Sequence, residues 1–167
     1  DEQFRPMCEH EKFRGSRHAY VKMWKQHTAT KEADEISFKG GKELDRFGGK
    51  VMSEWGIPKI LETLRCDPEL YRETYRFMEV GDWLIEELTG NETMSRCSAG
   101  LKFMWQPEVG YPSRDFFASI DHNLRDVEDK LVPNSKILPL DTCAGYITEE
   151  AAAWTGLKAG TPVAPMR

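Results

Sequence analysis

Helix start signals, each followed by apolar residues at helical spacing, constrain the fold of this chain most. Asp67-Pro68-Glu69 predicts a helix that runs to about Arg76, because aspartate accepts from free backbone amides and proline fits the first helical turn. Just before it, Ser53 precedes an apolar stripe that contains Pro58, so that helix should start or kink near the proline. The stripe consists of Trp55, Ile57, Ile60, Leu61 and Leu64.

A longer helical stretch begins at Ser113 and is expected to break near Asp121. Its apolar residues should face inward: they are Phe116, Phe117, Ile120, Leu124, Val127 and Leu131. Shorter helices are predicted after Thr28 or Thr30, over 42–47 before Gly48-Gly49, over 82–88 with Asp82 as its cap, and over 148–155.

Strands are fewer. Residues 77–80 are interpreted as a short strand or turn, 93–105 as one interrupted strand or two, and 158–164 as leading to a final strand. Helices that alternate with few strands indicate an α/β or α+β domain. These strands are too few for a complete sheet, so residues 1–167 are interpreted as one incomplete domain.

Composition excludes several classes of protein. The chain has 167 residues, 40% of them hydrophobic, with 23 Lys and Arg against 28 Asp and Glu. That suits one globular domain without the basic surface that nucleic acids or anionic membranes attract. No apolar run approaches the ~20 residues that span a bilayer.

The chain starts at Asp1 without an initiator methionine, and a polar, charged segment follows rather than a signal peptide. We expect it to be a piece of a longer protein, with a trimmed small protein as the alternative. Cys8, Cys66, Cys97 and Cys143 lie far apart and form no CxxC pair. Without a secretory signal, their even number is weak evidence for disulfides, which favours reduced thiols and a cytoplasmic location. Cys8 and His10 lack a second ligand pair, so no metal site is predicted.

Common nucleotide and hydrolase motifs are absent. Gly41-Lys42 does not complete a P-loop, because Ile36 stands where the first glycine is needed. The sequence also lacks GxGxxG, HExxH and GxSxG.

Several segments nevertheless resemble one family in order along nearly the whole chain. They are 18–29 (HAYVKMWKQHTA), 47–59 (FGGKVMSEWGIPK), 81–90 (GDWLIEELTG), 97–105 (CSAGLKFMW), 144–145 (AG), 148–152 (TEEAA) and 156–164 (GLKAGTPVA). Together they are similar to the ribulokinase branch of the FGGY carbohydrate kinases. The GDWL…LTG element is typical of sugar kinases generally. The first and fourth segments narrow the resemblance from sugar kinases in general to the ribulokinase branch.

The resemblance implies a partial ribonuclease H-like domain of the actin/hexokinase type, helix-rich with few strands. The chain would be the later part of the N-terminal domain. The phosphate-binding hairpin would precede Asp1, and the catalytic aspartate and the ATP-binding C-terminal domain would follow Arg167. No catalytic residue is therefore expected within this chain, and the chain alone should be inactive.

The resemblance also implies a sugar site. Trp24 matches the family's sugar-facing tryptophan, whose ring can cover the C–H face of a polyol; an ordinary buried tryptophan is the alternative. Lys102 follows the small residues 98–100 and could donate to sugar hydroxyls; a solvated strand lysine is the alternative. Trp55, Trp83 and Trp105 are interpreted as core residues.

Two neighbours of Trp24 complete the predicted site. Gln26 departs from the family, which usually carries an acid there, and its uncharged amide can still bond hydroxyls. His27 is expected either to touch substrate or to order the loop.

The implied activity is transfer of phosphate from MgATP to the 5-hydroxyl of L-ribulose in pentose catabolism, with a ketopentose and the absent kinase domain as partners. A related xylulose or ribitol kinase is the near alternative. A non-catalytic sugar-binding or scaffolding module is the alternative of a different class. Exposed apolar surface in an incomplete domain would favour a homo-oligomer.

Overall fold

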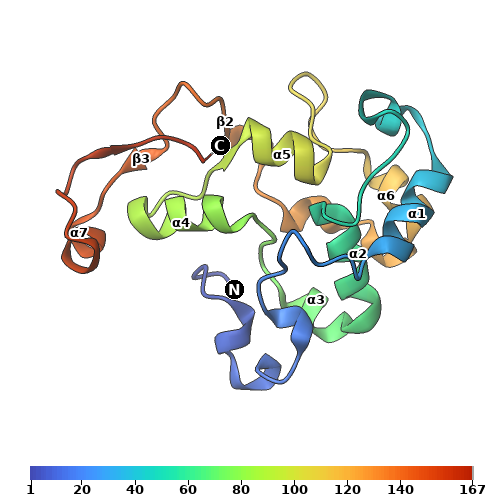
Figure 1. Ribbon diagram of the computed structural model, residues 1–167, viewed down its shortest axis with the longest axis horizontal. Helices are drawn as coiled ribbons and strands as arrows, with labels where there is room; N and C mark the ends of the chain where they lie inside the picture. Colours follow the sequence, from blue (N-terminus) through green and yellow to red (C-terminus); the bar gives the residue numbers. More distant parts are fainter. Residues whose placement is uncertain (167) are drawn as a thin grey trace.

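The computed structural model describes residues 1–166, in which helices predominate (Figure 1). The α-helices are α1 (Thr30–Lys39), α2 (Gly56–Cys66), α3 (Pro68–Glu73), α4 (Val80–Thr89), α5 (Arg96–Phe103), α6 (Arg114–Ile120) and α7 (Glu149–Thr155). The 3₁₀ turns are η1 (Met7–Glu9), η2 (Glu11–Phe13), η3 (Arg17–Ala19), η4 (Lys42–Phe47), η5 (His122–Leu124), η6 (Val127–Lys130) and η7 (Asn134–Lys136).

Side-chain caps begin the helices where the sequence predicts them. The Asp67 carboxylate accepts from the Leu70 amide at 3.1 Å, and Pro68 opens α3. Ser113 and Thr148 cap α6 and α7 in the same way. Because each cap satisfies an amide that the helix leaves free, these local signals fix the helix starts, and the predictions there are confirmed.

The prediction of strand over 93–105 is wrong for most of that segment. Only Met94–Ser95 (β1) is extended, and α5 follows it at once. The Ser95 hydroxyl accepts from the Ser98 amide at 3.0 Å and so caps α5. Lys102 is therefore a helix residue rather than a strand residue.

The start of α4 also differs from the prediction. Residues 77–79 are an irregular connection, and the helix begins at Val80 rather than at Asp82. Asp82 does not cap α4; its carboxylate accepts from the Ser95 amide at 3.0 Å instead. This bond ties the first turn of α4 to the start of α5.

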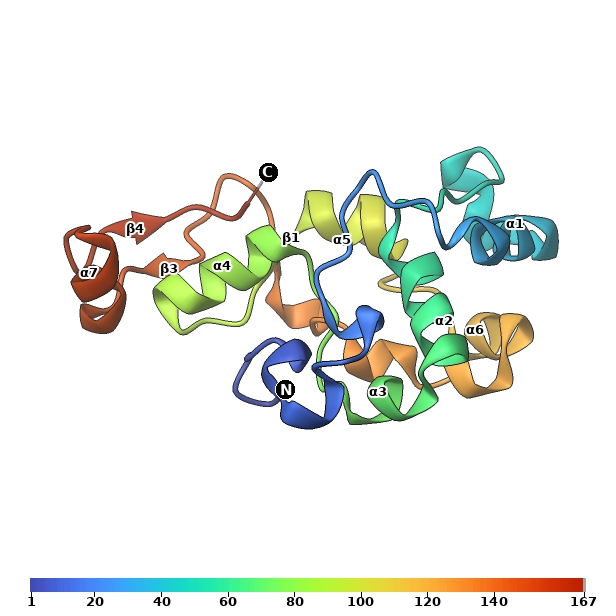
Figure 2. The ribbon, with the colours of Figure 1, turned by 60° about the horizontal axis from the view of Figure 1, so that its bottom comes forward.

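The strands form two small pairs. β1 pairs in parallel with β2 (Ile137–Leu138), and β3 (Gly145–Tyr146) pairs antiparallel with β4 (Pro162–Val163). The β3–β4 pair and α7 form an arm that projects from the helical body beside α4 (Figure 2). The chain is thus α/β and helix-rich with few strands.

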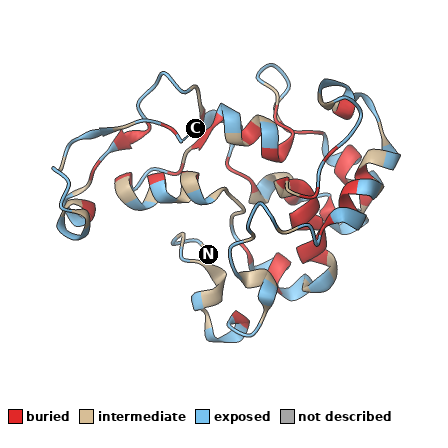
Figure 3. Cartoon of the chain, in the orientation of Figure 1, coloured by how far each residue is buried: buried red, intermediate tan, exposed pale blue. Residues whose placement is uncertain are grey.

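The core lies in the helical body, where Figure 3 shows most of the buried residues. Ile57, Leu61, Phe117 and Leu124 are completely or almost completely buried. The apolar residues predicted to face inward after Ser113 are all buried, which confirms that pattern. Trp55 and Trp105 are core residues as predicted, whereas Trp83 is only half-buried.

A close approach at Gly56 joins α2 to α5. A Cβ atom at this position would overlap the Phe103 ring, so the absence of a side chain lets the first turn of α2 lie against the last turn of α5. Lys59 on α2 and Lys102 on α5 are carried by these two turns.

Candidate functional site

Trp24 and Lys102 meet in space. Trp24 lies in the loop between η3 and α1, and 62% of its surface is exposed. Lys102 lies in the last turn of α5 and is 5% exposed. Its Nζ atom is 3.7 Å from the centroid of the Trp24 ring, which is the geometry of a cation–π contact.

Charged side chains surround this pair. Burial lowers the pKa of the Lys102 ammonium, the Glu79 carboxylate opposes that shift, and Lys59 adds to it. Burial likewise raises the pKa of Glu79, against the effect of both lysines. Two ammonium groups and a carboxylate therefore share a partly dry region, where hydrogen bonds to a polar ligand are stronger than in water.

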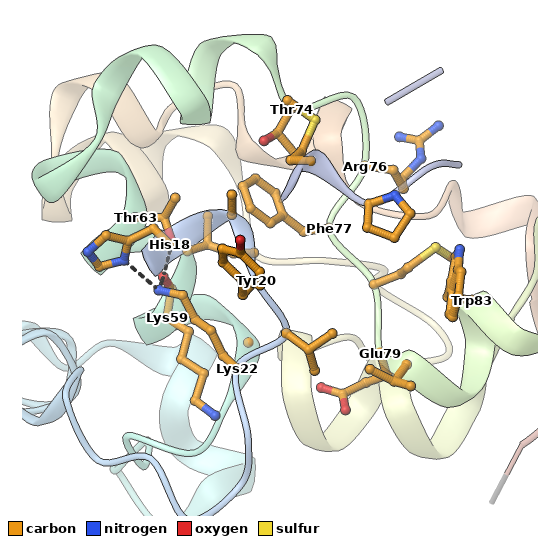
Figure 4. A pocket seen from close by; sticks show the side chains of 18 of the residues that line it. His18, Tyr20, Lys22, Lys59, Thr63, Thr74, Arg76, Phe77, Glu79 and Trp83 are labelled. Carbon is orange, nitrogen blue, oxygen red and sulfur yellow. Dashed lines mark hydrogen bonds between the residues drawn. The ribbon is translucent and has the colours of Figure 1, made fainter. Parts of the chain in front are cut away.

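A mostly apolar cavity of about 250 Å³ opens beside the Trp24 loop (Figure 4). His18, Lys22 and Lys59 lie on one side of it, with Glu79 and Trp83 on the other. Its lining includes Trp24 but not Lys102. The Lys102 ammonium contacts the Trp24 ring and so lies next to the cavity lining.

The other two predicted site residues lie outside the cavity lining. The Gln26 amide donates to the Thr28 hydroxyl at 3.3 Å. His27 Nδ1 lies 3.0 Å from Glu54 Oε1 and 3.2 Å from Ser53 Oγ. These contacts link the loop of His27 to residues 53–54, before α2, and both roles expected for His27 stay predictions.

Sequence reasoning missed Lys59 and Glu79. Lys59 is 8% exposed, and its Nζ donates to the Met23 carbonyl at 2.9 Å. The available signal was a lysine inside the apolar stripe of α2, since a lysine is almost never buried without a partner. Glu79 gave no comparable signal, because it lies in an irregular connection.

Asp82 is a further buried ionisable group near the site, at 1% exposure. Burial raises its pKa to about 6, and the hydrogen bond from the Ser95 amide opposes the rise. Its position between α4 and α5 makes it a link in the scaffold that carries Lys102.

Metal-binding clusters, membrane-spanning helices and disulfides were each sought in the described residues. Among residues 1–166, no group of three His, Cys, Asp or Glu side chains is arranged to hold a metal ion. Within the same residues, no helix is both long and apolar enough to cross a membrane. All four cysteines are free thiols.

Comparisons with known proteins agree with the resemblance. No protein-family profile matches the chain. The chain is 42% identical over 163 residues to a ribulokinase of Anoxybacillus flavithermus and 43% identical over 164 residues to one of Geobacillus thermodenitrificans. Each match covers 95% of this chain and 29% of the relative, so the chain spans under a third of the length of these relatives.

Solved structures show the same fold. A xylulose kinase from Brucella ovis matches with a TM-score of 0.67 at 19% identity, over 85% of this chain and 28% of the other. A xylulose kinase from Rhodospirillum rubrum matches with a TM-score of 0.56 at 21% identity, over 77% of this chain and 28% of the other. The fold is therefore that of part of an actin/hexokinase-type domain, and over nearly its whole length the chain is similar to one segment of ribulokinases.

Proposed function

We propose that this chain is the later part of the N-terminal domain of an ATP-dependent ribulokinase and supplies one wall of its sugar site. The observation that carries the proposal is the contact between Trp24 and Lys102. Two residues expected to touch the sugar, on separate elements, adjoin each other beside a cavity. The identity to ribulokinases over 95% of the chain supports L-ribulose as the substrate.

Each residue has a role that its chemistry suits. The exposed Trp24 ring would cover the C–H face of a pentulose, as indole faces do with sugars. The Lys102 ammonium would donate hydrogen bonds to a sugar hydroxyl and offset negative charge on the transferred phosphoryl group. Gln26 and His27 stay predictions as direct substrate ligands, since their contacts are with their own loop and with Glu54.

MgATP and the catalytic base are assigned to other parts of the complete kinase. The sequence has no phosphate-binding glycine loop, and the described residues offer no metal-binding cluster. On this proposal the chain binds and orients the sugar, and we expect no phosphoryl transfer by the chain alone. Domain closure in the complete enzyme would exclude water from the sugar.

A chimera tests the proposal. The segment would replace its counterpart in the Anoxybacillus flavithermus ribulokinase, and ATP-dependent phosphorylation of L-ribulose, xylulose and ribitol would be measured. We expect turnover of L-ribulose with the highest kcat/KM of the three. A folded chimera that prefers xylulose or ribitol would reassign the substrate. A folded chimera that phosphorylates none of them would favour a non-catalytic sugar-binding module.

A further inference from the structure

The loop that carries Trp24 is held in place mainly by another element. Within the loop, the main-chain amide of Gln26 donates to the Met23 carbonyl at 3.0 Å and closes a turn around Trp24. The ring itself is largely exposed, so core packing does not fix its direction. A ring that must face Lys102 therefore needs an anchor outside the loop.

Lys59 of α2 provides that anchor. Its Nζ atom donates to the Met23 carbonyl at 2.9 Å, one residue before Trp24. The side chain is 8% exposed, and burying an ammonium is costly unless hydrogen bonds compensate it. The compensating hydrogen bond goes to the main chain of the Trp24 turn.

A lysine of the loop itself makes a second link to α2. Lys22 Nζ lies 2.9 Å from Glu62 Oε2 and donates to the Lys59 carbonyl at 3.2 Å. Both links therefore join the loop to α2, whose first turn packs against Phe103 of α5. The elements that carry Trp24 and Lys102 therefore share α2 as their support.

We propose that Lys59 is a positioning residue for the sugar site: by binding the Met23 carbonyl, it sets the Trp24 ring against Lys102 and aims it at the pentulose. The inference rests on the proposed function for the sugar and on the hydrogen bond alone for the ring. Lys59 acts through Trp24 and does not itself touch the reacting atoms.

The first test measures the ring position in this chain by NMR. The ε-methylene protons of Lys102 lie near the Trp24 ring face, so the ring current shifts their resonance upfield. We expect Lys59→Met to remove most of that shift and Lys59→Arg, which keeps a charged donor, to retain it. Lys59→Gln, a shorter polar variant, gives a second measurement should the methionine variant fold poorly.

Lys130 supplies a matched control. Its Nζ also donates to main-chain carbonyls, those of Arg72 and Thr74, and within residues 1–166 none of its hydrogen bonds goes to the Trp24 loop. Lys130→Met should therefore leave the Lys102 resonance unchanged even if it lowers stability as much as Lys59→Met does. An unchanged Lys102 shift in folded Lys59→Met and Lys59→Gln would overturn the inference.

The second test measures sugar use in the chimera. Losing a hydrogen bond from a charged donor changes a dissociation constant by about tenfold. We therefore expect Lys59→Met to raise KM for L-ribulose about tenfold with a smaller effect on kcat, Lys59→Arg to recover most of the loss, and Lys130→Met to have none. If Trp24→Leu weakens sugar use and Lys59→Met does not, the inference fails. If neither changes KM, the proposed sugar site fails, and the NMR shift still decides the positioning role.

Discussion

The ammonium of Lys102 lies 3.7 Å from the centroid of the Trp24 ring, although the loop and helix that carry them are far apart in the sequence. Indole is the aromatic group that binds cations best. The contact leaves the other surfaces of the exposed ring free for a ligand and keeps a positive charge beside it. A surface that combines an aromatic face with a charged donor suits a polyhydroxylated ligand.

The energy of this contact is measurable by a double-mutant cycle. We expect Trp24→Leu and Lys102→Met to couple by about 0.5–1 kcal/mol, the range for a cation–π contact at an exposed ring. Urea unfolding of this chain, its two single variants and the double variant gives that value. Trp24→Phe should retain part of the coupling, and a coupling of zero would show that the two groups do not interact in solution.

The pair formed by Lys22 and Glu62 should contribute strongly to stability. The two side chains are 14% and 5% exposed, so Glu62→Gln leaves a nearly buried ammonium without its counter-charge. We expect a loss of about 2 kcal/mol in the free energy of unfolding. Glu73→Gln is the control, because the pair between Lys12 and Glu73 is 47% and 41% exposed and exposed pairs contribute about 0–1 kcal/mol. Equal losses for both variants would contradict the assignment.

Asp82 should make stability depend on pH. Burial raises the pKa of its carboxyl from 3.8 to about 6 in the folded chain, so the folded state holds this proton more tightly than the unfolded state does. The contribution of Asp82 is then most favourable below pH ~4 and is lost as the pH rises through 6. The loss amounts to ~3 kcal/mol for a shift of this size.

Asp82→Asn isolates this effect, because asparagine does not titrate and its carbonyl can still accept from the Ser95 amide. Urea unfolding of both proteins between pH 4 and pH 7 gives the comparison. We expect the stability of the original chain to fall relative to that of the variant as the pH rises to 6, and to stay level above it. A constant difference over the range would show that the Asp82 pKa is not raised.

Gly56→Ala should disturb the support of the site. The added methyl group overlaps the Phe103 ring, so the ring or the helix must move, at a cost of about 1–3 kcal/mol. Because Lys102 adjoins Phe103, its NMR signals should shift as well. Gly15→Ala is the control, since nothing lies within 4 Å of a Cβ placed there. A Gly56→Ala chain as stable as the Gly15→Ala chain would contradict the close packing.

Local signals made the helix starts predictable from the sequence. The caps at Asp67, Ser113 and Thr148 depend on residues three positions away, so the sequence contains all of their determinants. The segment from 93 to 105 was wrongly predicted as strand, although it too contains a local helix start signal. Ser95 is also a cap, and the small residues that follow it fit a helix as readily as a strand.

The candidate site was predictable only in part. The family resemblance singled out Trp24 and Lys102, and the structure brings them into contact. Lys59 was not predictable as a partner of this site, because its bond to the Met23 carbonyl depends on how the loop folds over α2. Main-chain atoms carry no residue-specific signal in a sequence, so such an anchor becomes visible only in three dimensions.

Steady-state kinetics of the ribulokinase chimera test the sugar site most directly. We expect Lys102→Met to lower kcat/KM for L-ribulose about 100-fold, as loss of a charged donor to a developing charge does, and Trp24→Leu chiefly to raise KM. Folded variants that both keep kcat/KM within a factor of two of the unsubstituted chimera would contradict this expectation.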